Sequence, residues 1–196
     1  MKFIKLAIVA VILSGCVSSG KDFSHVKLDQ LELGKASVVD VMQRLGEPYR
    51  SGSINKNGKT FETIVYAYAK DGGEAAISGA TPARSQAFYF HKDQLVGSEF
   101  TSSWKADSTN FDESKLDLIK ENSSSISELT SFLGEAKGEY IYPLVKTEGE
   151  KAKVYLFTYS KAHGLQISIY SKRLVATYNA ATGIISSLEY QSQGNE

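Results

Sequence analysis

The chain has 196 residues, of which 42% are hydrophobic and 11% are aromatic, so it can form a globular core of ordinary composition. Its 22 basic and 22 acidic residues give a formal net charge of zero, which argues against a dedicated nucleic-acid-binding protein. The single cysteine excludes an intramolecular disulfide and a cysteine-based zinc site, and the three histidines lie far apart. We therefore predict no metal and no cofactor.

The N-terminal residues resemble the signal sequence of a bacterial lipoprotein. Lys2 and Lys5 form a short basic start, the apolar run LAIVAVIL follows, and the sequence LSGC ends at Cys16. The apolar run is too short for a membrane-spanning helix, which needs about 20 residues, but it fits a signal peptide. The resemblance implies that residues 1–15 are removed and that Cys16 carries a lipid with acyl chains such as palmitate. The alternative is an ordinary signal peptide that happens to contain a cysteine.

The residues after Cys16 favour the outer membrane as the destination. Inner-membrane lipoproteins usually carry Asp directly after the cysteine, whereas this chain has Val17 and Ser18. By this resemblance the protein is anchored in the outer membrane and faces the periplasm. Residues 16–24 are expected to form a polar, lipidated tether, of which residues 17–24 would span no more than about 28 Å when stretched. The folded part would therefore lie near the membrane surface.

Two segments of the chain are similar at an offset of 88 residues. At this offset KLD at 27–29 matches 115–117, Ser37 matches Ser125, and LGE at 45–47 matches 133–135. At an offset of 89, Tyr66 matches Tyr155 and Tyr89 matches Tyr178, among others. A period of this length is too long for a solenoid repeat. The sequence therefore predicts a first unit at 25–104, a linker at 105–113 and a second unit at 114–196.

Each unit is predicted to begin with helices and to continue with strands. Ser37-x-x-Asp40 and Ser125-x-x-Glu128 have the pattern of a helix N-cap, and apolar residues then recur at helical spacing up to a glycine. A shorter helical turn is expected before each of these helices. Strand-like segments follow in both units: 61–69, 85–91, 95–104, then 153–160, 166–170, 174–178 and 184–190. The predicted fold class is α+β, with two tandem units, each a helical pair packed on a three- to four-stranded antiparallel sheet.

The capped helix ending in LGEP and the aromatic strand with Tyr66 and Tyr68 resemble the BamE (SmpA/OmlA) lipoprotein family. The segment FYFHKDQLVGSEF resembles the closing hairpin of that family. The resemblance implies a small outer-membrane lipoprotein that assists the insertion of β-barrels. The tandem arrangement is similar instead to β-lactamase inhibitory protein, in which two helix–sheet units form one concave surface that binds an enzyme. Family members usually have one unit, and the inhibitor carries disulfides that this chain cannot form.

The sequence contains no signature of an enzyme. Ser37 and Ser125 are explained as helix caps, and no nucleophile elbow, P-loop, Rossmann fingerprint or metal cluster is present. We therefore predict a non-enzymatic outer-membrane lipoprotein that acts as a protein-binding module in outer-membrane assembly or maintenance, with an envelope protein as its partner. The alternatives are an inhibitor of a periplasmic or secreted hydrolase and, as a further rival, a small enzyme.

The aromatic residues of the strands leave two interpretations open. Alternation places Ile64, Tyr66 and Tyr68 on one face of a strand, and Val65, Ala67 and Ala69 on the other. Either the large rings fill the core and the small residues face water, or the small residues face the core and the rings are exposed for binding. On the second interpretation, the predicted protein-binding residues are the tyrosines that recur in both units: Tyr66, Tyr89, Tyr155 and Tyr178.

Overall fold

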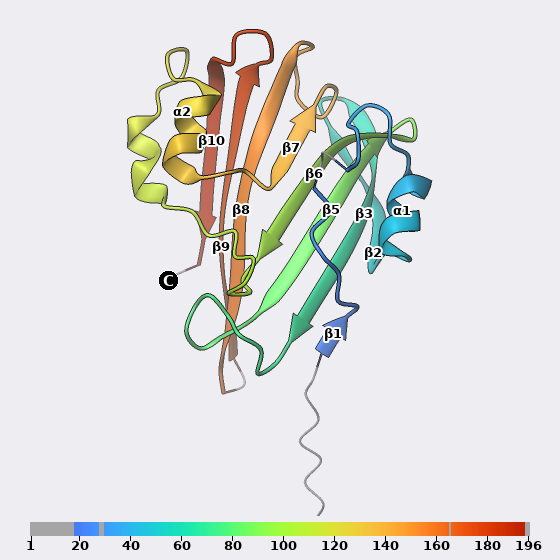
Figure 1. Ribbon diagram of the computed structural model, residues 1–196, viewed down its shortest axis with the longest axis vertical. Coiled ribbons are helices and arrows are strands. Elements are labelled where there is room, and N and C mark those ends of the chain that lie inside the picture. The colour runs from blue at the N-terminus through green and yellow to red at the C-terminus, as the bar shows by residue number, and fades with distance from the viewer. Residues whose placement is uncertain (1–17, 28–29, 165, 195–196) are drawn as a thin grey trace, which may run out of the picture.

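The computed structural model describes residues 18–27, 30–164 and 166–194, and its strands form one antiparallel sheet (Figure 1). The strands are β1 (Ser18–Gly20), β2 (Arg50–Lys56), β3 (Lys59–Lys70), β4 (Ala80–Thr81), β5 (Ala83–His91), β6 (Gln94–Ser102), β7 (Gly138–Ile141), β8 (Glu150–His163), β9 (Gln166–Asn179) and β10 (Ile185–Gln193). The helices are α1 (Val38–Leu45), the 3-10 helix η1 (Glu113–Leu118) and α2 (Ile126–Leu133).

The predicted α+β fold of two units with separate small sheets is wrong. The ten strands form a single sheet in the order β1-β3-β5-β6-β7-β8-β9-β10, with β2 also paired to β3 and β4 to β8. Strands account for 50% of the structure and helices for 13%. The expected helical pair is wrong for the first half, because the described residues directly before α1 contain no helix, whereas the short turn expected before α2 is the 3-10 helix η1. The fold is therefore mainly antiparallel β.

The two halves join where β6 of the first half pairs with β7 of the second. Gly97 pairs with Tyr140 and Ser98 pairs with Glu139. A Cβ atom on Gly138 would lie 2.8 Å from the carbonyl oxygen of Ser98, so only glycine permits this approach of the two backbones. Residues 95–100 of β6 are buried on both faces of the sheet, as expected for a central strand. The merged sheet follows from this strand, which the prediction had assigned to the sheet of the first unit alone.

Both α-helices begin with the predicted caps. The Ser37 side chain accepts a hydrogen bond from the backbone of Asp40, and the carboxylate of Asp40 accepts one from the backbone of Ser37 at 2.7 Å. Ser125 and Glu128 form the same reciprocal pair at the start of α2. This hydrogen bonding holds the pKa of Asp40 below its usual value. The local sequence thus determines where each helix starts.

Helices α1 and α2 cover the same face of the sheet. Paired residues run across this face from Ile64 through Phe88, Ser98, Glu139 and Lys153 to Ala176. Val41 of α1 packs in a core cluster with Ile64, and Leu129 of α2 packs in another with Ala176. On β3 the large ring of Tyr66 lies in the helix-covered core, whereas Ala67 lies on the other face. The first of the two interpretations of this strand is therefore the one that the structure shows.

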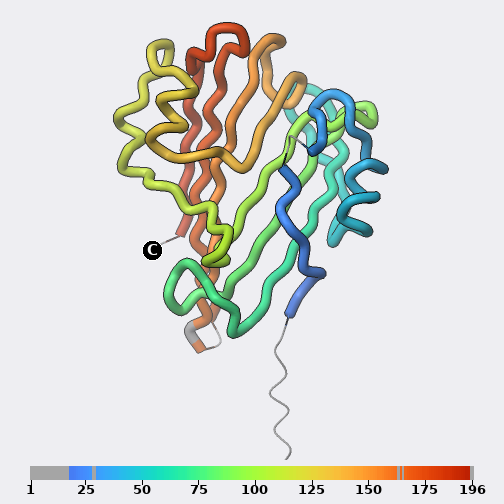
Figure 2. The backbone as a smooth tube through the Cα atoms, in the orientation of Figure 1, coloured from blue at the N-terminus to red at the C-terminus, as the bar shows by residue number. Residues whose placement is uncertain are grey.

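The N-terminal segment is fixed to the sheet from its first described residue. Ser18–Gly20, which were expected within a free tether, form β1 and pair with the end of β3. Residues 20–27 and 30–36 then lie across the helix-covered face (Figure 2), where the backbone of Val26 exchanges hydrogen bonds with the buried side chain of Gln86. The predicted signal peptide and Cys16 lie outside the described residues. None of the helices in the described ranges is long and apolar enough to cross a membrane.

Residues 105–113, which were expected to link two units, pack against the sheet. The Thr109 hydroxyl donates a hydrogen bond to the carbonyl oxygen of Leu156 at 2.6 Å. The ring of Phe111 is buried, and its carbonyl oxygen accepts a hydrogen bond from the Lys172 ammonium at 2.7 Å. These contacts attach the segment to strands of the second half.

Candidate interaction surface

The face of the sheet opposite the helices is closed at one end. There the hairpin of β2 and β3 reaches over the sheet, and the side-chain amide of Asn57 donates hydrogen bonds to the carbonyl oxygens of Pro143 and Leu144, both at 3.2 Å. Phe61 and Leu144 are almost completely buried in the cluster beneath. This part of the helix-free face is therefore a second core and is not available to a ligand.

The middle of the helix-free face carries a charged cluster whose members satisfy one another. The Arg173 guanidinium lies 2.7 Å from the Glu99 carboxylate and donates a hydrogen bond to the Tyr140 hydroxyl at 2.8 Å. Burial is the main cause that raises the pKa of Tyr89 far above its usual value, and the negative charge of Glu99 is the second cause. The Lys56 ammonium lies 5.3 Å from the centre of the Tyr140 ring, and burial lowers the pKa of Lys56. The contacts of Arg173 with Glu99 and Tyr140 thus connect β6, β7 and β9.

Toward β1, the helix-free face carries an open groove of about 220 Å³. Most of its lining consists of small, uncharged side chains, and the full set is Ser19, Tyr49, Ala67, Tyr68, Ala69, Ala83, Arg84, Ser85, Thr101 and Thr158. Tyr49 at its edge is 61% exposed. On its other side Tyr49 borders a second hollow of about 320 Å³, which Phe23, Pro48 and Tyr66 also line. An exposed aromatic side chain thus stands between two hollows.

The groove arises because β1 and β2 pair with the same edge of β3 but do not meet. Arg50 of β2 pairs with Val65, and Gly20 of β1 pairs with Tyr68, so Tyr66 and Ala67 lie between them. Gly20 has a φ angle of +78°, and a Cβ atom there would lie 2.0 Å from the carbonyl oxygen of Ala67. Glycine is therefore required where β1 ends.

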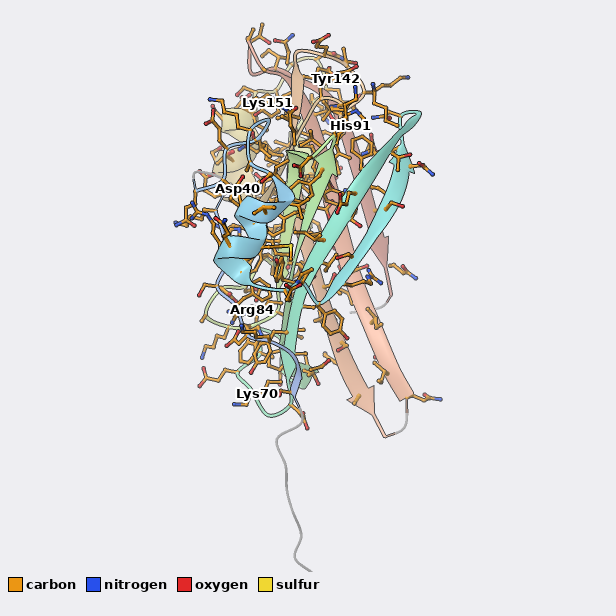
Figure 3. All side chains as sticks on the ribbon, turned by 90° about the vertical axis from the view of Figure 1, so that its right-hand side faces the viewer. Asp40, Lys70, Arg84, His91, Tyr142 and Lys151 are labelled. Atoms are coloured by element: carbon orange, nitrogen blue, oxygen red, sulfur yellow. The ribbon has the colours of Figure 1, made fainter. Side chains whose placement is uncertain are left out.

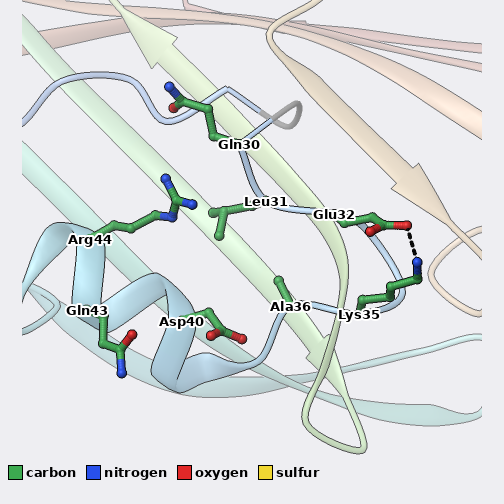
Figure 4. A pocket seen from close by; sticks show the side chains of 8 residues that line it. All are labelled: Gln30, Leu31, Glu32, Lys35, Ala36, Asp40, Gln43 and Arg44. Atoms are coloured by element: carbon green, nitrogen blue, oxygen red, sulfur yellow. Dashed lines mark ion pairs between the residues drawn. The ribbon is translucent and has the colours of Figure 1, made fainter.

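A third hollow, of about 520 Å³, lies between α1 and the preceding segment and is lined by Gln30, Leu31, Glu32, Lys35, Ala36, Asp40, Gln43 and Arg44 (Figure 4). Its acidic groups are already engaged. Glu32 lies 2.7 Å from Lys35, and Asp40 forms the helix cap. Across residues 18–27, 30–164 and 166–194, no group of three or more histidine, cysteine or acidic side chains could hold a metal ion.

The structure does not bring the four predicted tyrosines together on one surface. Tyr66 and Tyr155 are 4% exposed, and each donates a hydrogen bond to the carbonyl oxygen of the glycine that ends a helix. Tyr178 is 9% exposed and lies in the core beneath α2. Tyr89 lies on the opposite face, beside Glu99. These positions fit the core role that the sequence left open for the tyrosines.

Tyr49 was missed by the sequence analysis. The predicted tyrosines recur in both units and alternate along strands, whereas Tyr49 does neither, because it lies between α1 and β2. The available signal was the sequence GEPY, in which an aromatic residue follows the glycine and proline that end a helix. Such a junction is typical of an exposed position.

Comparisons with known proteins give little further information. No protein-family model and no curated protein matches the chain, so the resemblance to the BamE family has no support from them. Among solved structures, the chain has a distant likeness to a Streptococcus mutans protein described as a "putative beta-lactamase inhibitor protein". The two are 14% identical, the match covers 85% of this chain and 89% of that chain, and the TM-score is 0.41. A similarity at this level carries no argument about function.

Proposed function

We propose that the protein is a non-enzymatic lipoprotein, anchored by Cys16 in the outer membrane and facing the periplasm, that binds another envelope protein through the groove beside Tyr49. The observation that carries the proposal is the groove itself. It is open, it is lined mostly by small uncharged side chains, and a 61% exposed tyrosine stands at its edge. Tyrosine is enriched among the residues that dominate protein interfaces, because its ring contacts apolar surface while its hydroxyl stays hydrated.

A protein is the ligand that this surface fits best. The small side chains of Ala67, Ala69 and Ser85 allow a partner's side chain to approach the sheet closely, and the two hollows flank Tyr49. The groove has one charged lining residue, Arg84, which is held by the Phe23 carbonyl oxygen at 3.0 Å, whereas the second hollow is also lined by Lys21, Asp22 and Glu47. Charged substrates would therefore find little in the groove to orient them, whereas an apolar side chain from a partner would be buried there.

We propose that the protein is not an enzyme because the polar side chains that could act in catalysis are already paired with one another. In the described part of the chain, Arg173, Glu99 and Tyr140 on the helix-free face are paired with one another, and the acidic groups in the hollow beside α1 are engaged in a helix cap and an ion pair. General acid–base catalysis needs a titratable group that can reach a substrate. The groove beside Tyr49 is lined by no acidic side chain, histidine or cysteine.

Site-specific photocrosslinking in cells tests the proposal. A photoreactive amino acid at Tyr49 is expected to give a discrete crosslinked product with another envelope protein. The same amino acid at Val39, which is 58% exposed on α1, is the matched control and is expected to give none. Equal products from both positions, or none from either, would count against the groove as the binding site.

A groove-filling substitution provides a second measurement. Ala67→Arg places a long side chain in the groove and is expected to abolish the crosslink at Tyr49 while the protein remains folded, because Ala67 is only partly buried. Val39→Arg should leave the crosslink unchanged. The identity of the crosslinked protein then separates two functions. A component of outer-membrane assembly supports the proposal, whereas a soluble hydrolase would favour the inhibitor alternative.

A further inference from the structure

The folded body is fixed close to the predicted lipid anchor. Ser18 pairs with Lys70, and Gly20 pairs with Tyr68, so the chain is part of the sheet from its first described residue. Cys16 lies two residues before Ser18 and is therefore at most about 7 Å from it along the chain. A lipid on Cys16 would hold the end of β3 near the membrane, rather than letting the body move on a long tether.

The hairpin of β8 and β9 projects at this same end of the molecule (Figure 1). Its last pair is His163 with Gln166, whereas β4 accompanies β8 only as far as Lys161 and β10 accompanies β9 only as far as Ser171. Figure 3 shows Lys70, at the end of β3, toward this end of the molecule, and Tyr142 toward the opposite end. The hairpin tip therefore extends beyond its neighbouring strands on the side where the anchor attaches.

The hairpin exposes apolar side chains that nothing in the described fold covers. Ile167 is 71% exposed, more than any other large hydrophobic side chain in the described ranges, and Ile169 is 60% exposed. Because they are two residues apart on β9, both lie on the same face. Isolated exposed hydrophobic residues are common, but two at the projecting tip of one hairpin form a contact surface.

The two isoleucines lie on the opposite face of the hairpin from its aromatic pair. Tyr159 and Tyr170 are paired residues whose ring centres lie 5.2 Å apart, and both are buried, at 6% and 5% exposed. Ile167 and Ile169 are each offset from Tyr170 by an odd number of residues along β9, so their side chains leave the other face. The buried rings therefore support the hairpin from one side, and the isoleucines present an apolar surface on the other.

We propose that the tip of the β8–β9 hairpin, through Ile167 and Ile169, contacts the surface of the same bilayer that holds the lipid on Cys16. This inference rests on the acylation of Cys16 in the proposed function. The two contacts together fix the orientation of the sheet relative to the membrane. They hold the groove beside Tyr49, whose lining includes Ser19 and Ala69 next to the anchor, within reach of a partner in the same membrane.

The contact is apolar rather than electrostatic. The end of the molecule at which the hairpin projects carries Lys70 and Lys161, but also Asp71 and Glu74 in the loop after β3. This end therefore has no marked excess of positive or negative charge. The insertion of the isoleucines should therefore persist at high salt, where attraction between exposed charges and anionic lipid is screened.

Fluorescence of labelled, full-length lipidated protein in vesicles tests the inference. Ile167→Cys is labelled with an environment-sensitive dye, and Tyr142→Cys at the opposite end is the matched control; acylated Cys16 has no free thiol to react. Vesicles contain phosphatidylethanolamine and phosphatidylglycerol with brominated acyl chains. We expect the dye at 167 to lie in the interfacial region, about 5–10 Å deep, to emit at shorter wavelength and to be quenched several-fold more than the dye at 142. Ile169→Cys should behave as Ile167→Cys does.

The outcomes separate this inference from the proposed function. Sedimentation with vesicles and the mass of the N-terminal peptide report acylation, so an unacylated protein that stays in solution would overturn the anchor itself and the inference with it. An acylated, vesicle-bound protein whose dye at 167 and at 169 behaves as the dye at 142 does would overturn the hairpin contact alone. If an Ile167→Cys protein does not fold, the Ile169→Cys protein decides.

Discussion

The two halves of the chain repeat the same set of contacts around their helices. Tyr66 donates a hydrogen bond to the carbonyl oxygen of Gly46 at 2.7 Å, and Tyr155 donates one to that of Gly134 at 2.9 Å. In each half the backbone just before the helix accepts a hydrogen bond from the last hairpin of that half, β5–β6 or β9–β10: the backbone of Leu95 donates to Ala36 at 2.7 Å, and that of Ile185 donates to Ser124 at 2.9 Å. The helix of each half is thus held to the sheet at both of its ends.

A phenylalanine and a cation recur in the same way. The Phe23 carbonyl oxygen accepts a hydrogen bond from Arg84, and the Phe111 carbonyl oxygen accepts one from Lys172. The ring of Phe23 lies 6.1 Å from that of Tyr66, and the ring of Phe111 lies 5.7 Å from that of Tyr155. Phe23 and Phe111 are 88 residues apart, and so are Arg84 and Lys172.

The halves differ in how completely this arrangement is covered. The Lys172 side chain is 5% exposed and Phe111 is buried, whereas the Arg84 side chain is 15% exposed and Phe23 is only partly buried. The first half ends at the sheet edge where β1 and β2 leave a gap, and the groove beside Tyr49 lies there. The comparison shows that one structural unit forms a closed core in one half and an open surface in the other.

The largest expected effect tests this difference in burial. Phe111→Ala is expected to lower the free energy of unfolding by about 3–5 kcal/mol, because it removes a buried ring and leaves a cavity. Phe23→Ala should cost clearly less, since part of its ring already contacts water. Urea denaturation of both variants gives the two values. Equal losses would show that the halves do not differ, and a two-step curve would contradict a sheet that unfolds as one unit.

Local features of the repeat could be predicted from the sequence. The reciprocal caps at Ser37 and Ser125 follow from side chains and backbone only three residues apart, so no information about the rest of the fold is needed. The contact of Tyr66 and Tyr155 with the helix ends recurs because both the tyrosine and the glycine recur. Features that depend on residues close together in the sequence are therefore found in the structure where they were predicted.

The pairing between strands could not be predicted in the same way. Tyr66 pairs with Gln86 and Tyr155 pairs with Leu174, so the strands β5 and β9 correspond at an offset of 88 and not 89. The one-residue difference places Tyr89 and Tyr178 on opposite faces, because neighbouring side chains on a strand alternate. The available signal for the merged sheet was the run LVGSEF, whose residues are all buried. The groove depends on where β1 and β2 stop, which no local pattern encodes.

A smaller effect, equal in both halves, is expected at alkaline pH. Burial raises the pKa of Tyr66 to about 12 and the pKa of Tyr155 to about 12, whereas the phenol of an unfolded chain ionises near about 10. The stabilisation is fully present below pH 10, because neither state is ionised there. As the pH rises from about 10 to about 12, the unfolded chain loses its phenolic protons first, so the free energy of unfolding decreases.

Urea denaturation at several alkaline pH values, together with phenolate absorbance, measures this effect. Tyr66→Phe and Tyr155→Phe each remove one late-titrating phenol and should flatten the pH dependence by similar amounts. Each also loses its hydrogen bond to a glycine carbonyl oxygen, at a cost of about 1 kcal/mol at neutral pH. A pH dependence unchanged in both variants would show that these phenols ionise normally in the folded protein.

The smallest expected effect concerns the helix caps, where the two halves should be indistinguishable. Ser37 and Ser125 accept hydrogen bonds from the third helical residue at 3.3 Å and 3.2 Å, and the carboxylates of Asp40 and Glu128 return hydrogen bonds at 2.7 Å in both cases. Ser37→Ala and Ser125→Ala should each lower the free energy of unfolding by about 1 kcal/mol, the typical value for losing an N-cap oxygen. Thermal unfolding of both variants provides the measurement, and Ser127→Ala on the exposed face of α2 is the control. Because each helix start is also held by a backbone hydrogen bond from the last hairpin of its half, neither variant should release its helix. A much larger loss in only one half would mean that this half depends on its cap for attachment to the sheet, and that the equivalence of the two helix starts is only apparent.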